Sequence, residues 1–267
     1  QKHLVWYGEY KPEYWTRFKD ACKAFLDKLN ASGGYSLVQA DGTRPEDYRL
    51  AYRTAYFDEG SSELIHSVHW LNKPGSSYNW YSWIGNTRSA YAVTQEYVEM
   101  FPWSDGTPFD WDKAENDGKL NQMFVTGDSV KGKTLLQNVR LTRDPRLYET
   151  VIVNGGIPTL DWTTAAMTGT PYETWVGGST GGKNSQDESG SFATGYRNMK
   201  YSFSEYAGHG LQWATIRLSD VYLMYAEALI QTNTSGNFKD AIEWIDKVRA
   251  RVGMKGLVEC NPDKDLL

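Results

Sequence analysis

The residues best suited to chemistry lie in one run, from Ser76 to Arg88, where aromatic rings alternate with hydrogen-bonding side chains. Sugars offer apolar C–H faces edged by hydroxyl groups, so a sugar site needs flat rings beside planar amide or guanidinium groups. The run has no helical or strand period, which places its rings on a loop, where ligand contacts concentrate. Alternatively, the rings seal the core under a long loop, since Trp is usually largely buried. The candidate glycan contacts in this run are Asn79, Trp80, Tyr81, Trp83, Asn86 and Arg88.

Other tryptophans stand in turn-rich sequence outside this run. Each either contacts a ligand or fills the core, and core packing is the commoner role of Trp. On composition alone, Trp103 and Trp162 join the candidate ligand-binding residues. The same two alternatives apply to Trp111 and Trp175.

Two motifs in the Gly- and Ser-rich stretch resemble those of enzymes. Residues 177–181 match a hydrolase nucleophile elbow with Ser179 as the nucleophile, but the motif needs a strand before it and a helix after it. Residues 177–183 imitate a phosphate loop, but Asn184 stands where a Ser or Thr would hold magnesium. Polar loop sequence follows in both cases, so we assign no catalytic residue.

Possible metal ligands occur twice. Glu63, His66 and His69 are spaced three apart, which brings ligands together on a helix. Residues 64–70 are strand-like in composition, however, and in a strand residues three apart point to opposite faces. Asp105, Asp110 and Asp112 lack the spacing of an EF-hand loop. No cofactor is predicted, and calcium stays an open question.

Charged residues flank Pro145 in the sequence Arg143-Asp144-Pro145-Arg146. Such a cluster looks catalytic, but it more often fixes a turn through paired guanidinium and carboxylate groups. We therefore expect these side chains to be structural.

The composition favours polar aromatic surfaces. Aromatic residues form 14% of the 267-residue chain, with 11 Trp and 18 Tyr but only 9 Phe. Trp and Tyr combine a ring with a polar group, which suits half-wet binding surfaces. A formal net charge of −5 argues against nucleic acid as a partner and slightly disfavours acidic glycans. Two cysteines form no disulfide framework, and Cys22 is expected to be a buried thiol.

Three regions follow from apolar spacing. Residues 12–30 form a predicted amphipathic helix, begun by Pro12 and ended by Gly33-Gly34. Residues 35–210 are loop-rich, with short helical pieces around 46–57, 94–101 and 133–153 and an exposed loop at 177–191.

Residues 211–267 hold two long predicted helices, marked by Leu218 to Leu229 and by Phe238 to Val252. Their link is short, so they must pack antiparallel, as in tetratricopeptide-type repeats. One pair cannot stand alone, so the helix at 12–30 or sequence outside this chain must stack on it. Tyr222 and Tyr225 lie on the apolar stripe and are expected to pack in the core.

The segments Ile216 to Ala228 and Val248 to Gly253 closely resemble the paired-helix signature of the RagB/SusD family. Further matching segments follow in the expected order along almost the whole chain: Gly34-Tyr35-Ser36-Leu37, Thr94-Gln95, Asp105-Gly106, Arg143-Asp144-Pro145-Arg146, Gly195-Tyr196 and Lys200-Tyr201. The resemblance implies a mainly α fold, with tetratricopeptide-like (SusD-like) helix pairs, long loop-rich insertions and little sheet. We predict one partial domain with a scaffold helix at 1–34, a ligand-binding region at 35–210 and a helix pair at 211–267.

The same resemblance implies a non-catalytic lipoprotein that is exposed on the cell surface. It would bind glycans and deliver them to a SusC-like, TonB-dependent transporter in the outer membrane. The sequence shows neither a signal peptide nor a spanning segment, so the lipid anchor is expected in an N-terminal part absent from this chain. Two other functions stay open: a glycoside hydrolase, which also pairs carboxylates with Trp, and a protein-binding helical solenoid.

Overall fold

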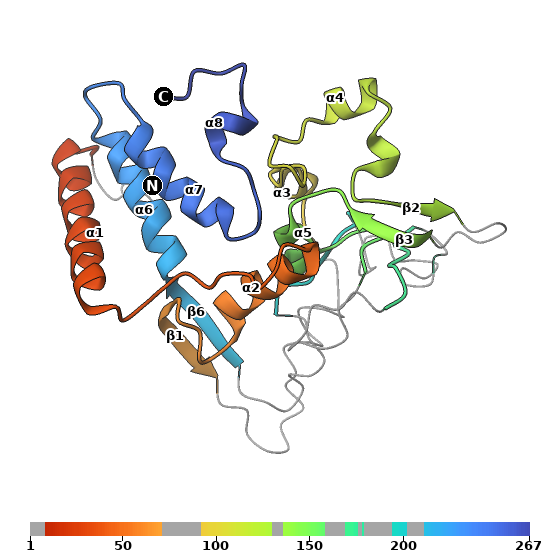
Figure 1. Cartoon of the computed structure of the whole chain (residues 1–267), viewed down its shortest axis with the longest axis horizontal. Helices are drawn as coiled ribbons and strands as arrows, with labels where there is room; N and C mark the ends of the chain where they lie inside the picture. The colour runs from red at the N-terminus through yellow and green to blue at the C-terminus, as the bar shows by residue number, and fades with distance from the viewer. Residues whose placement is uncertain are drawn as a thin grey trace.

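Helices dominate the structure, and its strands are short and pair two at a time (Figure 1). The computed structural model describes residues 9–70, 92–129, 136–157, 169–175, 178, 194–201 and 211–267. Its helices are α1 (Pro12–Ser32), α2 (Pro45–Phe57), α3 (Gln95–Glu99), α4 (Trp111–Asn116), α5 (Pro145–Thr150), α6 (Leu218–Gln231), α7 (Lys239–Ala250) and α8 (Leu257–Cys260), with a 3₁₀ turn at Leu120–Gln122. Its strands are β1 (Leu64–Trp70), β2 (Val125–Ser129), β3 (Leu136–Leu141), β4 (Val151–Ile152), β5 (Arg197–Asn198) and β6 (Leu211–Arg217).

The scaffold is a layer of α1, α6 and α7 (Figure 1). Pro12 lies in the first turn of α1, and Gly33 ends it with φ of 66° while its N–H donates to the Leu29 carbonyl. Leu26 and Leu29 of α1 pack with Leu218 of α6 in one apolar cluster. The predicted first helix is confirmed, and α1 is the stacking partner that the helix pair needs.

Helices α6 and α7 pack antiparallel, as the short link between them predicts. The Trp244 ring lies 5.5 Å from the Tyr225 ring and 4.7 Å from that of Tyr222, and the Lys247 ammonium lies 5.8 Å from the Tyr222 ring centroid. Contacts therefore move backward along α6 as they move forward along α7. Tyr222 and Tyr225 are half-buried in this seam, so they pack against the core without being enclosed by it.

An antiparallel pair of strands joins this layer to the rest of the chain. β1 pairs with β6, which runs directly into α6. Helix α2 packs on β6 and on α5, where the buried carboxylate of Glu149 binds Arg49 at 2.7 Å and Arg53 at 2.8 Å. β1 confirms the strand expected at 64–70.

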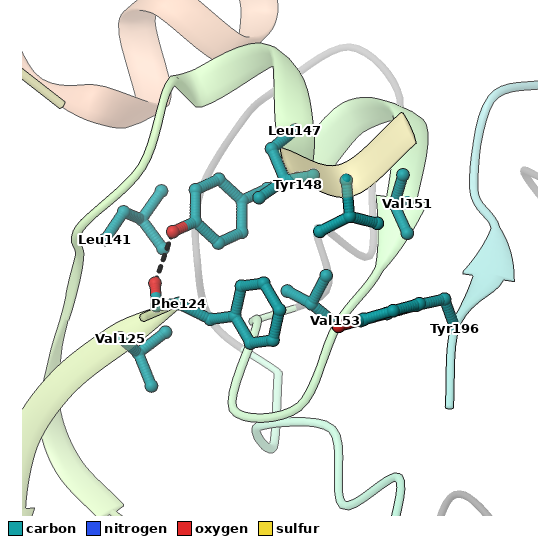
Figure 2. Packing of buried hydrophobic residues seen from close by; sticks show 9 residues of the cluster. Phe124, Val125, Leu141, Leu147, Tyr148, Val151, Val153 and Tyr196 are labelled. Atoms are coloured by element: carbon teal, nitrogen blue, oxygen red, sulfur yellow. Dashed lines mark hydrogen bonds between the residues drawn. The ribbon is translucent and has the colours of Figure 1, made fainter. Parts of the chain in front are cut away.

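A second apolar core lies under the β2–β3 hairpin (Figure 2). Phe124, Leu147, Tyr148 and Val153 are buried in it, and the Tyr148 hydroxyl donates to the Phe124 carbonyl. The helical piece predicted at 133–153 is wrong over most of its described part, because residues 136–141 pair with 125–129 as a strand. Only Pro145–Thr150 is helical, since Asp144 caps its first turn and Pro145 sets the first helical residue.

Candidate functional site

Of the predicted sugar contacts, Trp103 alone lies among the residues that the structure describes. Asn79, Trp80, Tyr81, Trp83, Asn86, Arg88 and Trp162 lie outside the described residues, as do Ser179 and nearly all of the loop at 177–191. The surroundings of Trp103 therefore form the described part of the candidate site.

Trp103 is held in a tight turn between α3 and α4. Its N–H donates to the Thr107 carbonyl at 2.9 Å, and its carbonyl accepts from Gly106 N–H at 2.8 Å. The half-buried ring lies 5.3 Å from the Phe109 ring, and its centroid is 5.6 Å from the guanidinium carbon of Arg143. One side of the indole is therefore packed against the protein.

A cleft of about 770 Å³ opens beside Trp103. Its walls are the turn at 103–110, α4 with the residues that lead into the β2–β3 hairpin, and the C-terminal residues 260–264. This volume lies within the range of small-molecule pockets in proteins. Segments far apart in the sequence thus enclose one aromatic ring and a set of polar side chains.

Charges of both signs line this Trp103 cleft. Some have structural partners: Asp105 accepts from both the N–H and the hydroxyl of Thr107, and Asp110 caps α4 by accepting from Lys113 N–H. Burial raises the pKa of Asp105, but these two hydrogen bonds and nearby Lys255 lower it further, so the carboxyl stays ionised at neutral pH. Arg140 and Lys264 are exposed and free to meet a ligand. The mixture suits hydroxyl groups, which both donate and accept.

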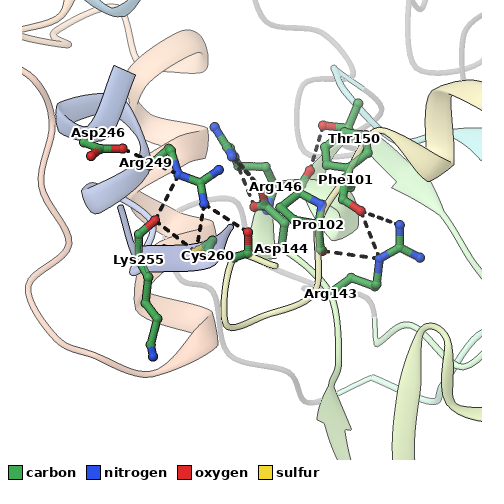
Figure 3. Close-up of polar contacts among 11 residues, drawn as sticks. Phe101, Pro102, Arg143, Asp144, Arg146, Thr150, Asp246, Arg249, Lys255 and Cys260 are labelled. Carbon is green, nitrogen blue, oxygen red and sulfur yellow. Dashed lines mark hydrogen bonds and ion pairs between the residues drawn. The ribbon is translucent and has the colours of Figure 1, made fainter. Parts of the chain in front are cut away.

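Two walls of the cleft are fastened to each other by Arg249 (Figure 3). Its guanidinium donates to the Gly106 carbonyl at 3.0 Å, to the Lys255 carbonyl at 2.9 Å and to the buried sulfur of Cys260 at 3.4 Å. Gly106 has a φ of 91°, and a Cβ there would stand 2.8 Å from both that guanidinium and the sulfur. Only glycine fits this junction.

A family model for SusD matches residues 51–265 of the chain. The chain belongs to the SusD family. Two solved structures resemble it in fold: a SusD-like protein from Bacteroides fragilis, 22% identical with a TM-score of 0.57, and the protein BT4246, 19% identical with a TM-score of 0.62. The alignments cover 92% and 93% of this chain but 45% and 46% of those two, so it spans about half their length. Comparison with the curated proteins gives no match.

The charged run of this SusD-family chain at Arg143, Asp144 and Arg146 is structural, as predicted. Asp144 binds the Arg146 guanidinium through both carboxylate oxygens, and it also accepts from Arg146 N–H (Figure 3). Arg143 is buried, donates to the carbonyls of Phe101, Pro102 and Val98, and lies 3.8 Å from the Phe109 ring centroid. Burial lowers the pKa of Arg143 to about 10, which leaves it charged at neutral pH.

The residues weighed as metal ligands have other partners in the SusD-family fold. Glu63 is buried against Arg251, and the Nδ1 atom of His66 lies 2.6 Å from the Thr215 hydroxyl. Asp105 and Asp110 serve the turn and the helix cap described above. Across the ranges that the structure describes, no three His, Cys, Asp or Glu side chains gather as a metal site.

A smaller hollow of about 210 Å³ borders the hairpin core at Phe124 and Val125. Tyr172 and the exposed Trp175 line it together with Asn154, whose amide oxygen accepts from Thr174 N–H at 3.2 Å. Trp175 is therefore an exposed ring beside a hollow, which its turn-rich sequence alone could not separate from a core residue. None of the helices in the described ranges is both long and apolar enough to cross a membrane.

Proposed function

We propose that this SusD-family chain binds oligosaccharides or polysaccharides without cleaving them. In the full-length protein it would do so at the cell surface, held to the outer membrane by a lipid anchor. The captured glycan would pass to a SusC-like, TonB-dependent transporter. Family membership supports the glycan-binding part of this proposal, and the resemblance that the sequence bears to SusD-like lipoproteins supports the rest.

The observation that carries glycan binding is the Trp103 cleft. It holds an aromatic ring, hydroxyl groups of Ser104 and Thr107, and the exposed cations Arg140 and Lys264 within about 770 Å³. Sugar recognition needs this combination of an apolar face with donors and acceptors around it. A protein-binding solenoid would instead concentrate its contact residues on the helices.

Binding is tested with a glycan array, followed by titration calorimetry on any glycan that is retained. Replacing both exposed cations, as Arg140→Ala with Lys264→Ala, should weaken binding by about 1–3 kcal/mol, since each loses hydrogen bonds from a charged donor. The control is Arg17→Ala with Lys28→Ala, which removes the same charges from the exposed face of α1. Equal affinity in both double variants would remove this cleft from the proposal.

The rival function is glycoside hydrolysis, which requires two carboxylates free to act on the bond. Two of the aspartates in the Trp103 cleft, Asp105 and Asp110, are already hydrogen-bonded to backbone. If the chain only binds glycans, incubation with the bound glycan should release no reducing sugar, and Ser179→Ala should change nothing measurable. Release of reducing ends that depends on Ser179 or on a carboxylate pair would replace binding by catalysis.

A further inference from the structure

Helix α2, helix α5 and the junction of β6 with α6 lie close together (Figure 1). More cationic than anionic side chains gather there. Tyr52 of α2 lies at the centre of this region, next to the Tyr56 ring at 5.2 Å. Four carboxylates face six cations around these two rings. The carboxylates are Glu63, Asp144, Glu149 and Asp220, and the cations are Arg49, Arg53, Arg146, Lys200, Arg217 and Arg251.

Each carboxylate already has an arginine partner. Glu149 serves two, and Asp144, Asp220 and Glu63 bind Arg146, Arg217 and Arg251, respectively. Lys200 has no carboxylate within ion-pair distance in the part of the chain that the structure describes. Its ammonium lies instead 4.6 Å from the ring centroid of Tyr56, 5.6 Å from that of Tyr52 and 5.9 Å from that of Tyr201. Aromatic faces hold the cation in place without neutralising it.

Two buried N–H donors near Tyr52 have no acceptor among the described residues. One is the Nη1 of Arg217, the residue that caps α6, and the other is the Nε of Arg251, whose guanidinium carbon lies 5.8 Å from the Tyr52 ring centroid. The positive end of the α6 dipole also lies at Arg217, because this residue is the N-cap of the helix. Buried N–H groups without acceptors are costly, so an acceptor supplied by a ligand would be favoured.

The pKa of the Tyr52 hydroxyl is sensitive to the charges around it. Burial raises this pKa, but the positive charges of Lys200, Arg217 and Arg146 lower it. The lowering is the larger effect, so the pKa lies below its ordinary value. The shift reflects these three cations together with a hydrogen bond to Thr150. The region is open on one side, where Tyr97 is 41% exposed and the Arg146 side chain 21% exposed.

We propose that this cationic cluster, defined by Tyr52, Lys200 and Arg217, binds an oxyanion: a carboxylate or sulfate group. The net charge of −5 disfavours acidic glycans for the chain as a whole. A bound ion, however, interacts mainly with charges within about one Debye length, so the local cations matter more. Trp213 lies next to the cluster, 44% exposed and stacked on Tyr201 at 4.8 Å between ring centroids. A sugar that carries the anion would rest against this ring. That part rests on the proposed glycan binding, while the anion site itself does not.

The test uses chain labelled with ¹⁵N-arginine and follows the side-chain Nε–H signals. Sodium glucuronate should cause saturable shifts at Arg217 and Arg251 and none at exposed Arg17, whereas sodium chloride at the same ionic strength and methyl glucoside should cause none. Lys200→Met should raise the dissociation constant at least tenfold, Lys200→Arg should largely keep it, and Lys28→Met on the surface of α1 should not change it.

Inorganic sulfate separates the sources of the anion. Tighter binding of glucuronate than of sulfate or acetate supports an acidic sugar as the ligand, and equal binding supports a free anion at the same cluster. Absence of saturable shifts in the parent chain with all three anions overturns the site. Equal dissociation constants for the parent chain and for a Lys200→Met variant that unfolds at the same temperature overturn it as well. Binding of neutral glycans is unaffected by Lys200→Met if the Trp103 cleft acts alone, so the two proposals fail separately.

Discussion

Arg251 binds both carboxylate oxygens of Glu63 at 2.7 Å, although the two residues are 188 positions apart. Both side chains are buried, and Glu63 also accepts from Val38 N–H at 3.2 Å. Glu63 precedes β1 and Arg251 follows α7, so this ion pair ties the strand pair to the helix layer. The carboxylate that resembles a metal ligand in the sequence is a structural anion.

Removing one partner of this pair should destabilise the fold strongly. Glu63→Gln leaves a buried guanidinium without a counter-charge, which costs about 3–5 kcal/mol of unfolding free energy. Denaturant unfolding measures the loss. Asp27→Asn, which breaks the exposed pair with Lys23, is the control and should leave the midpoint unchanged. A Glu63→Gln midpoint as little shifted as that of the control would contradict the role assigned to the pair.

The second prediction concerns alkaline pH. Burial raises the pKa of Tyr148 to about 12, and its hydroxyl accepts from the backbone N–H groups of Thr142 and Arg143. Above pH 10 the unfolded chain ionises at this position while the folded chain keeps its proton until about pH 12. The folded state therefore loses about 3 kcal/mol across this window.

Tyr148→Phe checks that sign. The variant should lose about 1–3 kcal/mol at pH 7, because the buried N–H of Arg143 loses its acceptor and the Phe124 carbonyl loses the Tyr148 hydroxyl. Its unfolding free energy should then fall less steeply than that of the parent between pH 10 and 12. Tyr10→Phe changes an exposed ring and should reproduce the parental slope. Parallel slopes for the parent and Tyr148→Phe would show that another group governs the alkaline loss.

The sequence predicts local elements well where one apolar face must be buried. Helix α1 and the pair α6–α7 follow from three- and four-residue spacing, and Pro12 and Gly33 mark the ends of α1. Residues 136–141 are predicted as part of a helix because their leucines and valine have helix-like spacing, but they form a strand. Pairing with 125–129 overrides that preference, and such pairing depends on distant residues.

The two proposed sites differ in how far the sequence reveals them. Trp103 is recognisable as a ring in turn-rich sequence, but the cleft beside it also needs residues 260–264. The cationic cluster has no local signal in the sequence, because Tyr52, Lys200 and Arg217 meet only after α2, β5 and β6 have packed. Residue types suggest chemistry, while convergence of distant segments decides where it can occur.

The last prediction returns to Trp80 and Trp83, which the sequence places on a glycan-binding loop. If either ring stacks on a sugar face, replacing it by Ala should weaken glycan binding by about 1–3 kcal/mol, by analogy with aromatic hot spots at other interfaces. Folding stability should barely change, because an exposed ring contributes little to the core. If the ring seals the core instead, the same substitution leaves a cavity that costs about 3–5 kcal/mol of stability.

Trp103→Ala is the internal standard for this comparison. Its ring both lines the cleft and packs against Phe109 and Arg143, so its loss should lower glycan affinity and thermal midpoint together. Measuring both quantities on Trp80→Ala, Trp83→Ala and Trp103→Ala separates a ligand contact from a packing residue. A large fall in the thermal midpoint of Trp83→Ala with unchanged glycan affinity would reject the loop as a binding site. It would leave membership of the SusD family untouched, because that rests on residues 51–265 as a whole.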